Sequence, residues 1–560
     1  MAAAEYLKEK NVDFILVEAQ ERLGGRIKNF DFKGFKVEDG ANWIHGQYNK
    51  EYCGDEYGPE CEKKRGKLKF LNPTWKWQKI HNDTTDYMQG AFTDYESETA
   101  IMYNGDEVDD EINDKCWEWV EEKAMDFCEK KASNLLKKYC ESKIDLKTME
   151  DQDTTLRQCF EDSDFIKYDN LTKDEKLVCK AVEWEMDQFE TGTMGASLIH
   201  NVPLNTKGLE AYNVGDFLIT DQRGYSHFLK MIAKGFWDDI IMSTKVEKIS
   251  YTDTGVNVET DNGYEIQADY AICTVPLGVL QHKDLTFDPP FSKAKVDAIK
   301  GFEMGNYAKI YVKFPSNFWG DKEVLKFIDD DGAAKSIMTW GLNLDHEKYF
   351  PGSKMLTFHP MGETARRIEN QLETETMKEV NVIMKKMFRS KALDATEIHV
   401  TNWTNNPFSY GSWSSIPHGY SMSEWELVRK NEKRLYFAGE HTSYNLGFVH
   451  SAYDSGKETA KRVFNHINGI CNPSRSVCPM RACVSTIPTT ATNPTTKDKI
   501  TSKDTTTPKS NVISNATVTS NTTVIPSAAN RQHETFILAI NNFLIVHFMF
   551  AISCQFFSEP

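Results

Sequence analysis

The stretch VEAQERLGGR at Val17–Arg26 decides the fold class of this chain. It continues an apolar run at Phe14–Val17 that is typical of a buried parallel strand, and a helix-forming segment at Ala2–Lys10 precedes that run. A helix followed by a buried strand that ends in an acidic residue, here Glu18, is the second half of a βαβ unit. We therefore expect an α/β fold in which Glu18 accepts hydrogen bonds from both ribose hydroxyls of a dinucleotide.

Two glycine-containing motifs add to this prediction. In Gly24–Arg26, two glycines allow the backbone to approach a pyrophosphate closely, and the arginine can donate paired hydrogen bonds to its oxygens. Such a sequence alone would be consistent with a simple turn, so the inference depends on Glu18 shortly before it. Far along the chain, Gly439-Glu440 follows an apolar strand and precedes a helix whose positive end can face the same ligand.

The bulk composition narrows the classes of protein that the chain can belong to. Among 560 residues, 83 acidic side chains outnumber 66 basic ones and give a net charge of −17. A nucleic-acid-binding surface needs the opposite charge, so we expect no nucleic acid as a partner. The acidic surface is consistent either with attraction of cationic ligands or with solubility alone. The 12 cysteines include no pairs spaced for zinc, so we expect no metal.

The order of the motifs along the chain is specific. It runs through Glu18, Gly24–Arg26, Gly40–Gly46, Asp221–Tyr225, Val275–Leu280 and Phe437–Thr442. This order resembles the flavin-dependent amine oxidases and, within that family, the extracellular plant type of polyamine oxidase. The resemblance covers residues 2–468 and implies bound FAD. It also implies a Rossmann-like FAD/NAD(P)-binding domain and an α+β substrate-binding domain with a mixed sheet and helices.

Helix-rich and strand-rich segments alternate in a way that indicates two discontinuous domains. The FAD-binding domain is expected to comprise residues 1–48, 206–285 and 415–470. The substrate-binding domain is expected to comprise residues 49–205 and 286–414. The cofactor domain would thus be assembled from three separate pieces of the chain.

The residues expected to contact FAD are spread over these pieces. They are Glu18, Gly24, Gly25, Arg26, Trp43, Val246, Gly439 and Glu440. The family pattern begins one element earlier, with a strand and a G-x-G-x-x-G loop whose amides bind the pyrophosphate. Because the helix at Ala2–Lys10 matches the residues after that loop, we expect an incomplete N-terminus and a parallel sheet without a central strand. If the chain is complete as printed, FAD binding should be impaired.

The resemblance places two residues at the reacting centre. Lys309 matches the family lysine that holds a water against flavin N5, where an ammonium group would support hydride acceptance and reoxidation electrostatically. The alternative is a strand lysine that points to solvent. His45 matches a position that contacts substrate, where a neutral imidazole can orient an amine or take its proton. The alternative for a lone histidine is a structural or solvated side chain.

Four further residues match the substrate pocket of the family. Trp413 and Phe448 fall where two aromatic rings guide an aliphatic amine toward the flavin, and either ring could equally belong to the core. Tyr307 is a weaker pocket candidate. Glu190 ends the acidic run 183–190, where a carboxylate can pair with a distal ammonium of spermidine or spermine. Other members of this run remain alternatives to Glu190, and a solvated charged face is the simpler interpretation for most of them.

The last part of the chain differs from the rest. Residues 484–530 are rich in Ser, Thr, Pro and Asn and cannot bury enough apolar surface to fold, so we expect a disordered, glycosylated stalk. Residues 536–557 are apolar and long enough to cross a bilayer, and Ser527–Ala529 before them resemble part of a glycolipid-anchor signal. We rank a lipid anchor ahead of a transmembrane helix, and a secreted form third.

Sequons and cysteines also favour a secreted or cell-surface location. The sequons are at Asn82, Asn170, Asn402, Asn515 and Asn521. Each can arise by chance, but together with loop-sited cysteines they favour the secretory pathway and some disulfides. We therefore expect an extracellular or cell-surface protein whose only membrane contact is its C-terminal segment.

These observations predict an FAD-dependent polyamine oxidase. Hydride transfer from the carbon beside an unprotonated secondary amine, hydrolysis of the imine and reoxidation by oxygen would give an aldehyde, an amine and hydrogen peroxide. The substrates would be oxygen and spermine, spermidine or an acetylated form. Two alternatives stay open: an oxidase of another amine or an amino acid, and a non-catalytic cell-surface protein that has lost its cofactor. The sequence gives no oligomeric state.

Overall fold

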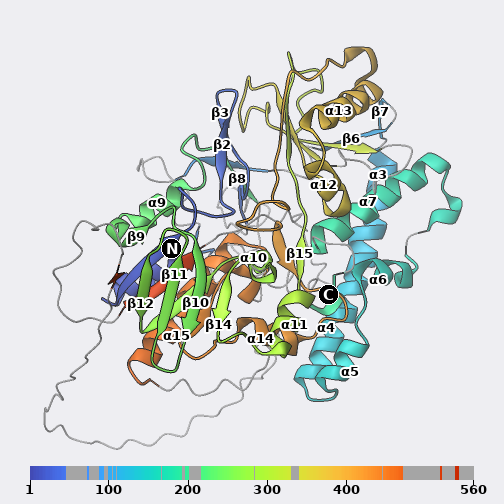
Figure 1. Ribbon diagram of the computed structural model, residues 1–560. Helices are drawn as coiled ribbons and strands as arrows, with labels where there is room; N and C mark the ends of the chain where they lie inside the picture. Colours follow the sequence, from blue (N-terminus) through green and yellow to red (C-terminus); the bar gives the residue numbers. More distant parts are fainter. Residues whose placement is uncertain are drawn as a thin grey trace, which may run out of the picture.

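The computed structural model describes residues 1–45, 72–74, 88–93, 99–103, 105–108, 110–165, 167–191, 196–200, 216–282, 284–328, 340–443, 446–470, 518–519 and 536–541. Within these residues, two five-stranded sheets and one seven-stranded sheet form the body of the molecule (Figure 1). Helices and smaller strand pairs connect them.

The first five-stranded sheet is parallel and has the order β22-β13-β24-β1-β9. Its strands are Leu435–Phe437 (β22), Tyr270–Thr274 (β13), Phe536–Asn541 (β24), Asp13–Glu18 (β1) and Ile240–Ile241 (β9). Helices Ala2–Glu9 (α1) and Val449–Ile467 (α15) pack closely, since a Cβ added at Gly456 of α15 would lie 3.3 Å from the Ala3 nitrogen of α1. The predicted helix–strand unit at the start of the chain is confirmed, as are the strand before Gly439 and the helix after it.

Strand β24 corrects one of our expectations. We expected the parallel sheet to lack a central strand, but β24 pairs with β1 along Asp13–Glu18 and with β13 along Tyr270–Thr274. It thereby uses the backbone N–H and C=O groups that the facing edges of β1 and β13 would otherwise leave unpaired. Six residues of the expected anchor segment 536–557 are thus a strand, and residues 542–557 lie outside the described residues. No described helix is both long enough and apolar enough to cross a membrane.

The second five-stranded sheet has the order β14-β10-β11-β12-β23. Its strands are Thr286–Asp288 (β14), Val246–Tyr251 (β10), Val256–Thr260 (β11), Glu265–Ala268 (β12) and Val518–Thr519 (β23). The predicted hairpin is confirmed, because β11 and β12 pair antiparallel and Gly263 in the turn between them has φ +84°. Strand β23 belongs to the expected stalk, and the remainder of residues 484–530 lies outside the described residues.

The seven-stranded sheet has the order β20-β16-β19-β18-β17-β6-β7. Its strands are Glu397–Val400 (β20), Ile310–Lys313 (β16), Met355–Phe358 (β19), Gly341–Asn343 (β18), Val324–Ile328 (β17), Thr99–Tyr103 (β6) and Asp106–Glu107 (β7). The pair β17–β6 is parallel and the other pairs are antiparallel, so the sheet is mixed, as predicted. Helices Gly362–Glu369 (α12) and Glu373–Phe388 (α13) share an apolar core with β16 and β19.

A helical layer lies to one side of this sheet, in the right half of Figure 1. Its elements are Asp110–Trp117 (α3), the π-helix Glu118–Met125 (η2), Asp126–Cys140 (α4), Leu146–Asp151 (α5), Leu156–Ser163 (α6), Tyr168–Asn170 (η3) and Lys173–Thr191 (α7). Two disulfides, Cys116–Cys179 and Cys128–Cys159, join its helices. The prediction of some disulfides is confirmed at these pairs, whereas Cys53, Cys61 and the cysteines after Ile470 lie outside the described residues.

Three short sheets position residues between the large ones. They pair Asn29–Phe32 (β2) with Phe35–Glu38 (β3), Glu303–Gly305 (β15) with Trp413–Ser415 (β21), and Phe217–Ile219 (β8) with both Trp43–Ile44 (β4) and Gly90–Phe92 (β5). The remaining helices are His227–Ala233 (α9), Trp237–Asp239 (η4), Leu277–Gln281 (α10), Lys293–Gly301 (α11), Arg389–Lys391 (η6), Met422–Arg429 (α14) and Glu440–Thr442 (η7).

Candidate active site

Glu18 lies at the carboxyl end of β1, where ligands of parallel sheets bind. Its side chain is buried and accepts a hydrogen bond from the Gln20 amide at 2.9 Å, while burial raises the pKa of its carboxyl group to about 8. Beside it is a cavity lined by Val17, Ala19, Thr244, Lys245, Val246, Val275, Val279, Asp284, Leu285, Pro407 and Phe408. The lining is mainly apolar, and two of its residues, Val17 and Ala19, flank Glu18 in the sequence. The cavity brings Val246, a predicted cofactor residue, close to the end of β1.

The two glycine-containing motifs meet in space although they lie far apart in the sequence. Arg26 donates from Nη1 to the Ser412 carbonyl at 3.0 Å and from Nη2 to Glu440 Oε1 at 3.4 Å. Glu440 also accepts hydrogen bonds from the Ser414 hydroxyl and, at 3.0 Å, from the Gly447 amide. Burial lowers the pKa of Arg26 to about 10, and Glu440 opposes this shift, so the guanidinium stays charged at neutral pH.

Gly24 has a backbone conformation that only glycine adopts without strain. Its φ is +116°, and a Cβ at this position would lie 2.5 Å from the Ile27 carbonyl oxygen. Gly439 likewise has φ +132°, and a Cβ there would lie 2.8 Å from the His441 ring. The local geometry therefore requires glycine at two of the three predicted cofactor glycines, Gly24 and Gly439. The third, Gly25, also has a positive φ, +54°.

Lys309 does not point to solvent. Only 2% of the residue is exposed, and its ammonium group donates to the Glu38 carbonyl at 2.9 Å, to Asn42 Oδ1 at 2.9 Å and to the Gly40 carbonyl. Burial lowers the pKa of the amine to about 7, while Glu38 opposes the shift. The Trp43 ring, another predicted cofactor contact, has its centroid 6.0 Å from the Lys309 nitrogen.

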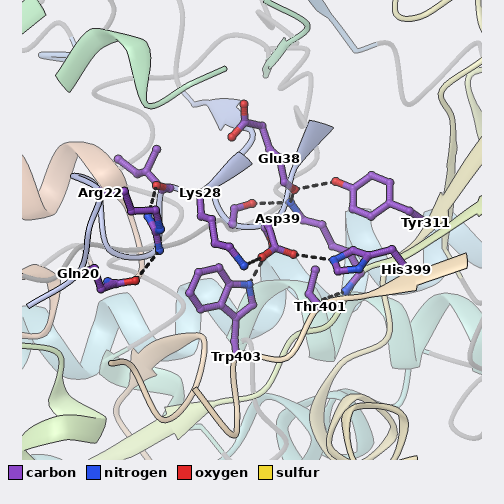
Figure 2. A network of polar contacts seen from close by, with 12 residues as sticks. Gln20, Arg22, Lys28, Glu38, Asp39, Tyr311, His399, Thr401 and Trp403 are labelled. Atoms are coloured by element: carbon purple, nitrogen blue, oxygen red, sulfur yellow. Dashed lines mark hydrogen bonds and ion pairs between the residues drawn. The ribbon is translucent and has the colours of Figure 1, made fainter. Parts of the chain in front are cut away.

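A polar network fixes the segment that binds Lys309 (Figure 2). Asp39 forms an ion pair with Lys28, accepts a hydrogen bond from His399 Nε2 at 3.1 Å, and its carbonyl accepts one from Trp403 Nε1 at 3.0 Å. Burial alone would raise the pKa of Asp39, but the contacts with His399 and Lys28 hold it below its usual value. Tyr311 donates to the Glu38 carbonyl at 2.7 Å. The contacts of Asp39 and of the Glu38 carbonyl thereby fix the segment that supplies the acceptors of Lys309.

The predicted pocket aromatics form two groups. The Tyr307 and Trp413 ring centroids lie 5.1 Å apart, and the Tyr307 hydroxyl bonds to His359 Nδ1. The Phe448 ring packs edge-on against His45, with centroids 5.3 Å apart. All four predicted residues of these groups are buried. That they line one substrate slot stays a prediction.

His45 is paired rather than isolated. Its Nδ1 lies 2.9 Å from Asp216 Oδ1, and its carbonyl accepts a hydrogen bond from Asn72 Nδ2 at 2.7 Å. Glu190 lies on helix α7, but its side chain is outside the described residues, so its role stays a prediction. No described group of His, Cys, Asp and Glu side chains could hold a metal ion.

Residues 1–464 match the family described as flavin containing amine oxidoreductase. The chain belongs to this family. Among its relatives are polyamine oxidase 6 of Oryza sativa subsp. japonica, 29% identical over 81% of this chain and 86% of that protein, and polyamine oxidase 1 of Zea mays, 28% identical over 83% and 88%. The family match also confirms the predicted resemblance.

A solved structure shows the same fold for this amine oxidoreductase. A double mutant of a putrescine oxidase, redesigned in its cofactor binding, superposes with a TM-score of 0.58 over 83% of this chain and 96% of the other chain. The sequence identity of 14% makes this a comparison of fold alone. The predicted α/β class, with a Rossmann-like domain and a second α+β region, is confirmed.

Sequence reasoning missed several residues that the structure adds to the site. Glu38 and Asp39 directly precede the Gly40–Gly46 motif. Two adjacent acidic residues give no sequence signal that their segment binds a lysine far along the chain. Asp216 was missed because its proximity to His45 depends on the pairing of β4 with β8. The short apolar runs at residues 43–44 and 217–219 are consistent with buried strands but do not specify that the two strands pair.

Proposed function

We propose that this flavin amine oxidoreductase is a polyamine oxidase that uses FAD and oxygen. The observation that carries the proposal is the buried ammonium group of Lys309, held by three oxygen acceptors in residues 38–42. The Ala41 amide of this segment donates a hydrogen bond to the Arg26 carbonyl at 3.1 Å. The two plant relatives are named polyamine oxidases, which supports a polyamine as the substrate class. Spermine, spermidine or an acetylated form would be oxidised at a secondary amine.

The described residues fit FAD. Glu18 at the end of β1 would bind the ribose, and Val246, which lines the cavity beside Glu18, would lie near the adenine ring. Gly24, Gly25 and Gly439 have the positive φ values expected of glycines in a pyrophosphate-binding turn, and the charged Arg26 would donate to the pyrophosphate oxygens. The chemistry that FAD supplies when bound is acceptance of a hydride from the carbon beside the amine and transfer of the electrons to oxygen.

The residues of the chain would bind the substrate and adjust the electrostatics around the flavin, whereas the flavin would carry the electrons. Lys309 places a positive charge where negative charge develops, and its acceptors fix that charge in position without reorganisation. The Tyr307–Trp413 pair offers ring faces that attract a cationic aliphatic amine. Glu190 on α7 would pair with a distal ammonium of a long polyamine. Water then hydrolyses the imine product to an aldehyde and an amine.

We also propose an extracellular or cell-surface location. The two disulfides of the helical layer support it, because disulfides persist in oxidising compartments. The sequons and the Ser/Thr-rich segment 484–530 support it further. Attachment through residues 536–557, by a lipid anchor or as a transmembrane helix, would compete with the pairing of β24 in the sheet, since one segment cannot occupy both places.

A substrate panel tests the proposed activity. Hydrogen peroxide release is measured with spermine, spermidine, N-acetylspermine, putrescine, a monoamine and several amino acids. The proposal expects turnover of at least one compound with a secondary amine at a rate well above that of the primary amines. Turnover of a primary amine or an amino acid alone would favour an oxidase of another class, and absence of turnover with bound flavin would favour a non-catalytic protein.

A further inference from the structure

The pairing of two short strands places His45 opposite Asp216. Strands β4 and β8 are antiparallel, with Trp43 paired to Leu218 and Ile44 to Phe217. One further step along this register brings the residue after β4 next to the residue before β8. His45 and Asp216 are therefore cross-strand neighbours by backbone geometry, before any side-chain contact is considered.

The side chains use this placement to form a buried pair. His45 Nδ1 lies 2.9 Å from Asp216 Oδ1, and the two side chains are 5% and 8% exposed. A carboxylate can only accept a hydrogen bond, so Nδ1 carries the proton. In a neutral imidazole this leaves the lone pair on Nε2, the nitrogen that faces away from Asp216.

The second nitrogen is poised for a ligand. His45 Nε2 is buried and has no hydrogen-bond partner among the described residues, and neither has Asp216 Oδ2. The Phe448 ring packs edge-on against the His45 imidazole. His450 stacks on the Phe448 ring, with the two ring centroids 4.9 Å apart. Burial lowers the pKa of His450 to about 3, so this neighbour is neutral and does not compete for the proton.

We infer that Asp216 is a positioning residue that holds His45 with its proton on Nδ1, so that Nε2 takes a proton from the secondary ammonium of the substrate. The inference rests on the proposed function, because a polyamine arrives protonated and must present a neutral amine before hydride leaves its neighbouring carbon. The ammonium N–H bond breaks and the Nε2–H bond forms. The carboxylate then stabilises the resulting imidazolium through the hydrogen bond on Nδ1.

The test compares the full flavin-loaded protein with Asp216→Asn, His45→Gln and the double variant. Asp221→Asn is the matched control, because Asp221 is a buried carboxylate just beyond the other end of β8 that binds Arg223 and the Gln89 amide and does not contact His45. The first readout is the rate of anaerobic flavin reduction by spermine. The second is the tautomer of His45 in the ¹⁵N-histidine-labelled protein, assigned by the signals that His45→Gln removes.

The inference expects Asp216→Asn and His45→Gln each to slow flavin reduction roughly a hundredfold, with flavin content unchanged. Because Asp216 acts through His45, the double variant should be no slower than His45→Gln alone. Asp221→Asn should reduce flavin within about twofold of the wild-type rate, and the Nδ1–H tautomer of His45 should be seen in wild type and lost in Asp216→Asn.

Two results overturn different parts of the account. If spermine bleaches the wild type and Asp216→Asn reacts equally fast, the positioning role of Asp216 is wrong. If no polyamine bleaches the wild type, the proposed function is wrong and the proton transfer falls with it, and the tautomer then tests only whether Asp216 positions His45. A proton on Nε2 in wild type would overturn it in either case.

Discussion

Lys309 combines full burial with a complete set of acceptors for its ammonium group. Even with these acceptors, burial lowers the pKa of the amine to about 7, so the charged form is less favourable here than in water. Its acceptors come from the segment after β3, which Asp39 anchors through Lys28 and His399. The contacts of Lys309 thus support the proposed electrostatic role of its ammonium group.

Replacing Lys309 by Met should slow flavin reduction or reoxidation by about a hundredfold, because it removes a preorganised positive charge. The change keeps the length and apolar stem of the side chain, so flavin content should stay close to wild type. Stopped-flow absorbance with spermine, and then with oxygen, measures both half-reactions. The control is Lys313→Met at the end of β16, the strand that directly follows Lys309; Lys313 lies near Phe35, outside the site. Equal losses in both variants would contradict the role of Lys309.

The pH dependence of stability provides a second test at Lys309. Burial lowers the pKa of this amine to about 7 in the folded protein, from the ordinary value of 10.5 that also describes the unfolded chain. Between these values the unfolded chain binds more protons, so stability rises with pH over this window. The midpoint temperature of thermal unfolding of the wild type, measured relative to that of Lys309→Met, should therefore rise as the pH increases from about 7 to about 10. A pH-independent difference would show that the lysine stays charged.

Some residues of the site could be predicted and others could not. Glu18 and Gly24 could be predicted from nearby residues. Glu18 ends an apolar strand, and the Gly24-Gly25 pair indicates a turn with a positive φ. Lys309 and His45 were found only through their resemblance to a family. Asp216 carried no local signal, because its role depends on strand pairing across a long interval of sequence.

The turn at Gly24 allows the proposed cofactor contact to be tested at the level of one structural element. Substitution by Ala at φ +116° costs about 1–3 kcal/mol of strain and adds the clash with Ile27. Gly24→Ala should therefore lower the flavin content of the purified protein. Gly34→Ala is the control, because Gly34 also has a positive φ, +93°, but a Cβ added there would meet nothing within 4 Å. Loss of flavin in both variants would mean that strain alone, not the position near the cofactor, is responsible.

Strand β24 is the element whose place can be tested most simply. Ala539 pairs with Leu16 of β1 and with Ile272 of β13. Ala539→Pro removes a backbone donor in the middle of the sheet and should destabilise the protein by about 1–3 kcal/mol and release flavin. Thermal unfolding followed by flavin fluorescence measures both effects. An unchanged midpoint would show that residues 536–541 do not complete the sheet and would favour the anchor hypothesis.

The elements themselves were largely predictable where the pattern was strong. The α1–β1 unit, the β11–β12 hairpin and the strand and helix around Gly439 follow from periodicity and turn residues. Strand β24 was assigned to a membrane anchor, since an apolar run has the same composition whether it lies in lipid or in the centre of a sheet. Only the unpaired edges of β1 and β13 distinguish the two environments, and these are properties of the assembled fold.

At the scale of the whole molecule, the chain joins a dinucleotide-binding parallel sheet to a mixed sheet and a helical layer (Figure 1). The candidate site lies where segments from many parts of the chain meet, with Arg26 and Glu440 in contact across 414 positions of sequence. Activity should therefore depend on the integrity of the whole fold rather than on one segment. Family membership was predictable from motif order, whereas substrate choice depends on the shape of the assembled pocket.

The visible spectrum of the purified protein, recorded before and after addition of spermine without oxygen, shows whether the protein binds a flavin and whether spermine reduces it. We expect a bound flavin whose absorbance band bleaches with spermine and returns when oxygen is admitted, with release of hydrogen peroxide. A flavin band that spermine leaves unchanged would contradict polyamine oxidation, and a colourless protein would contradict cofactor binding by the site built around Glu18, Arg26 and Lys309.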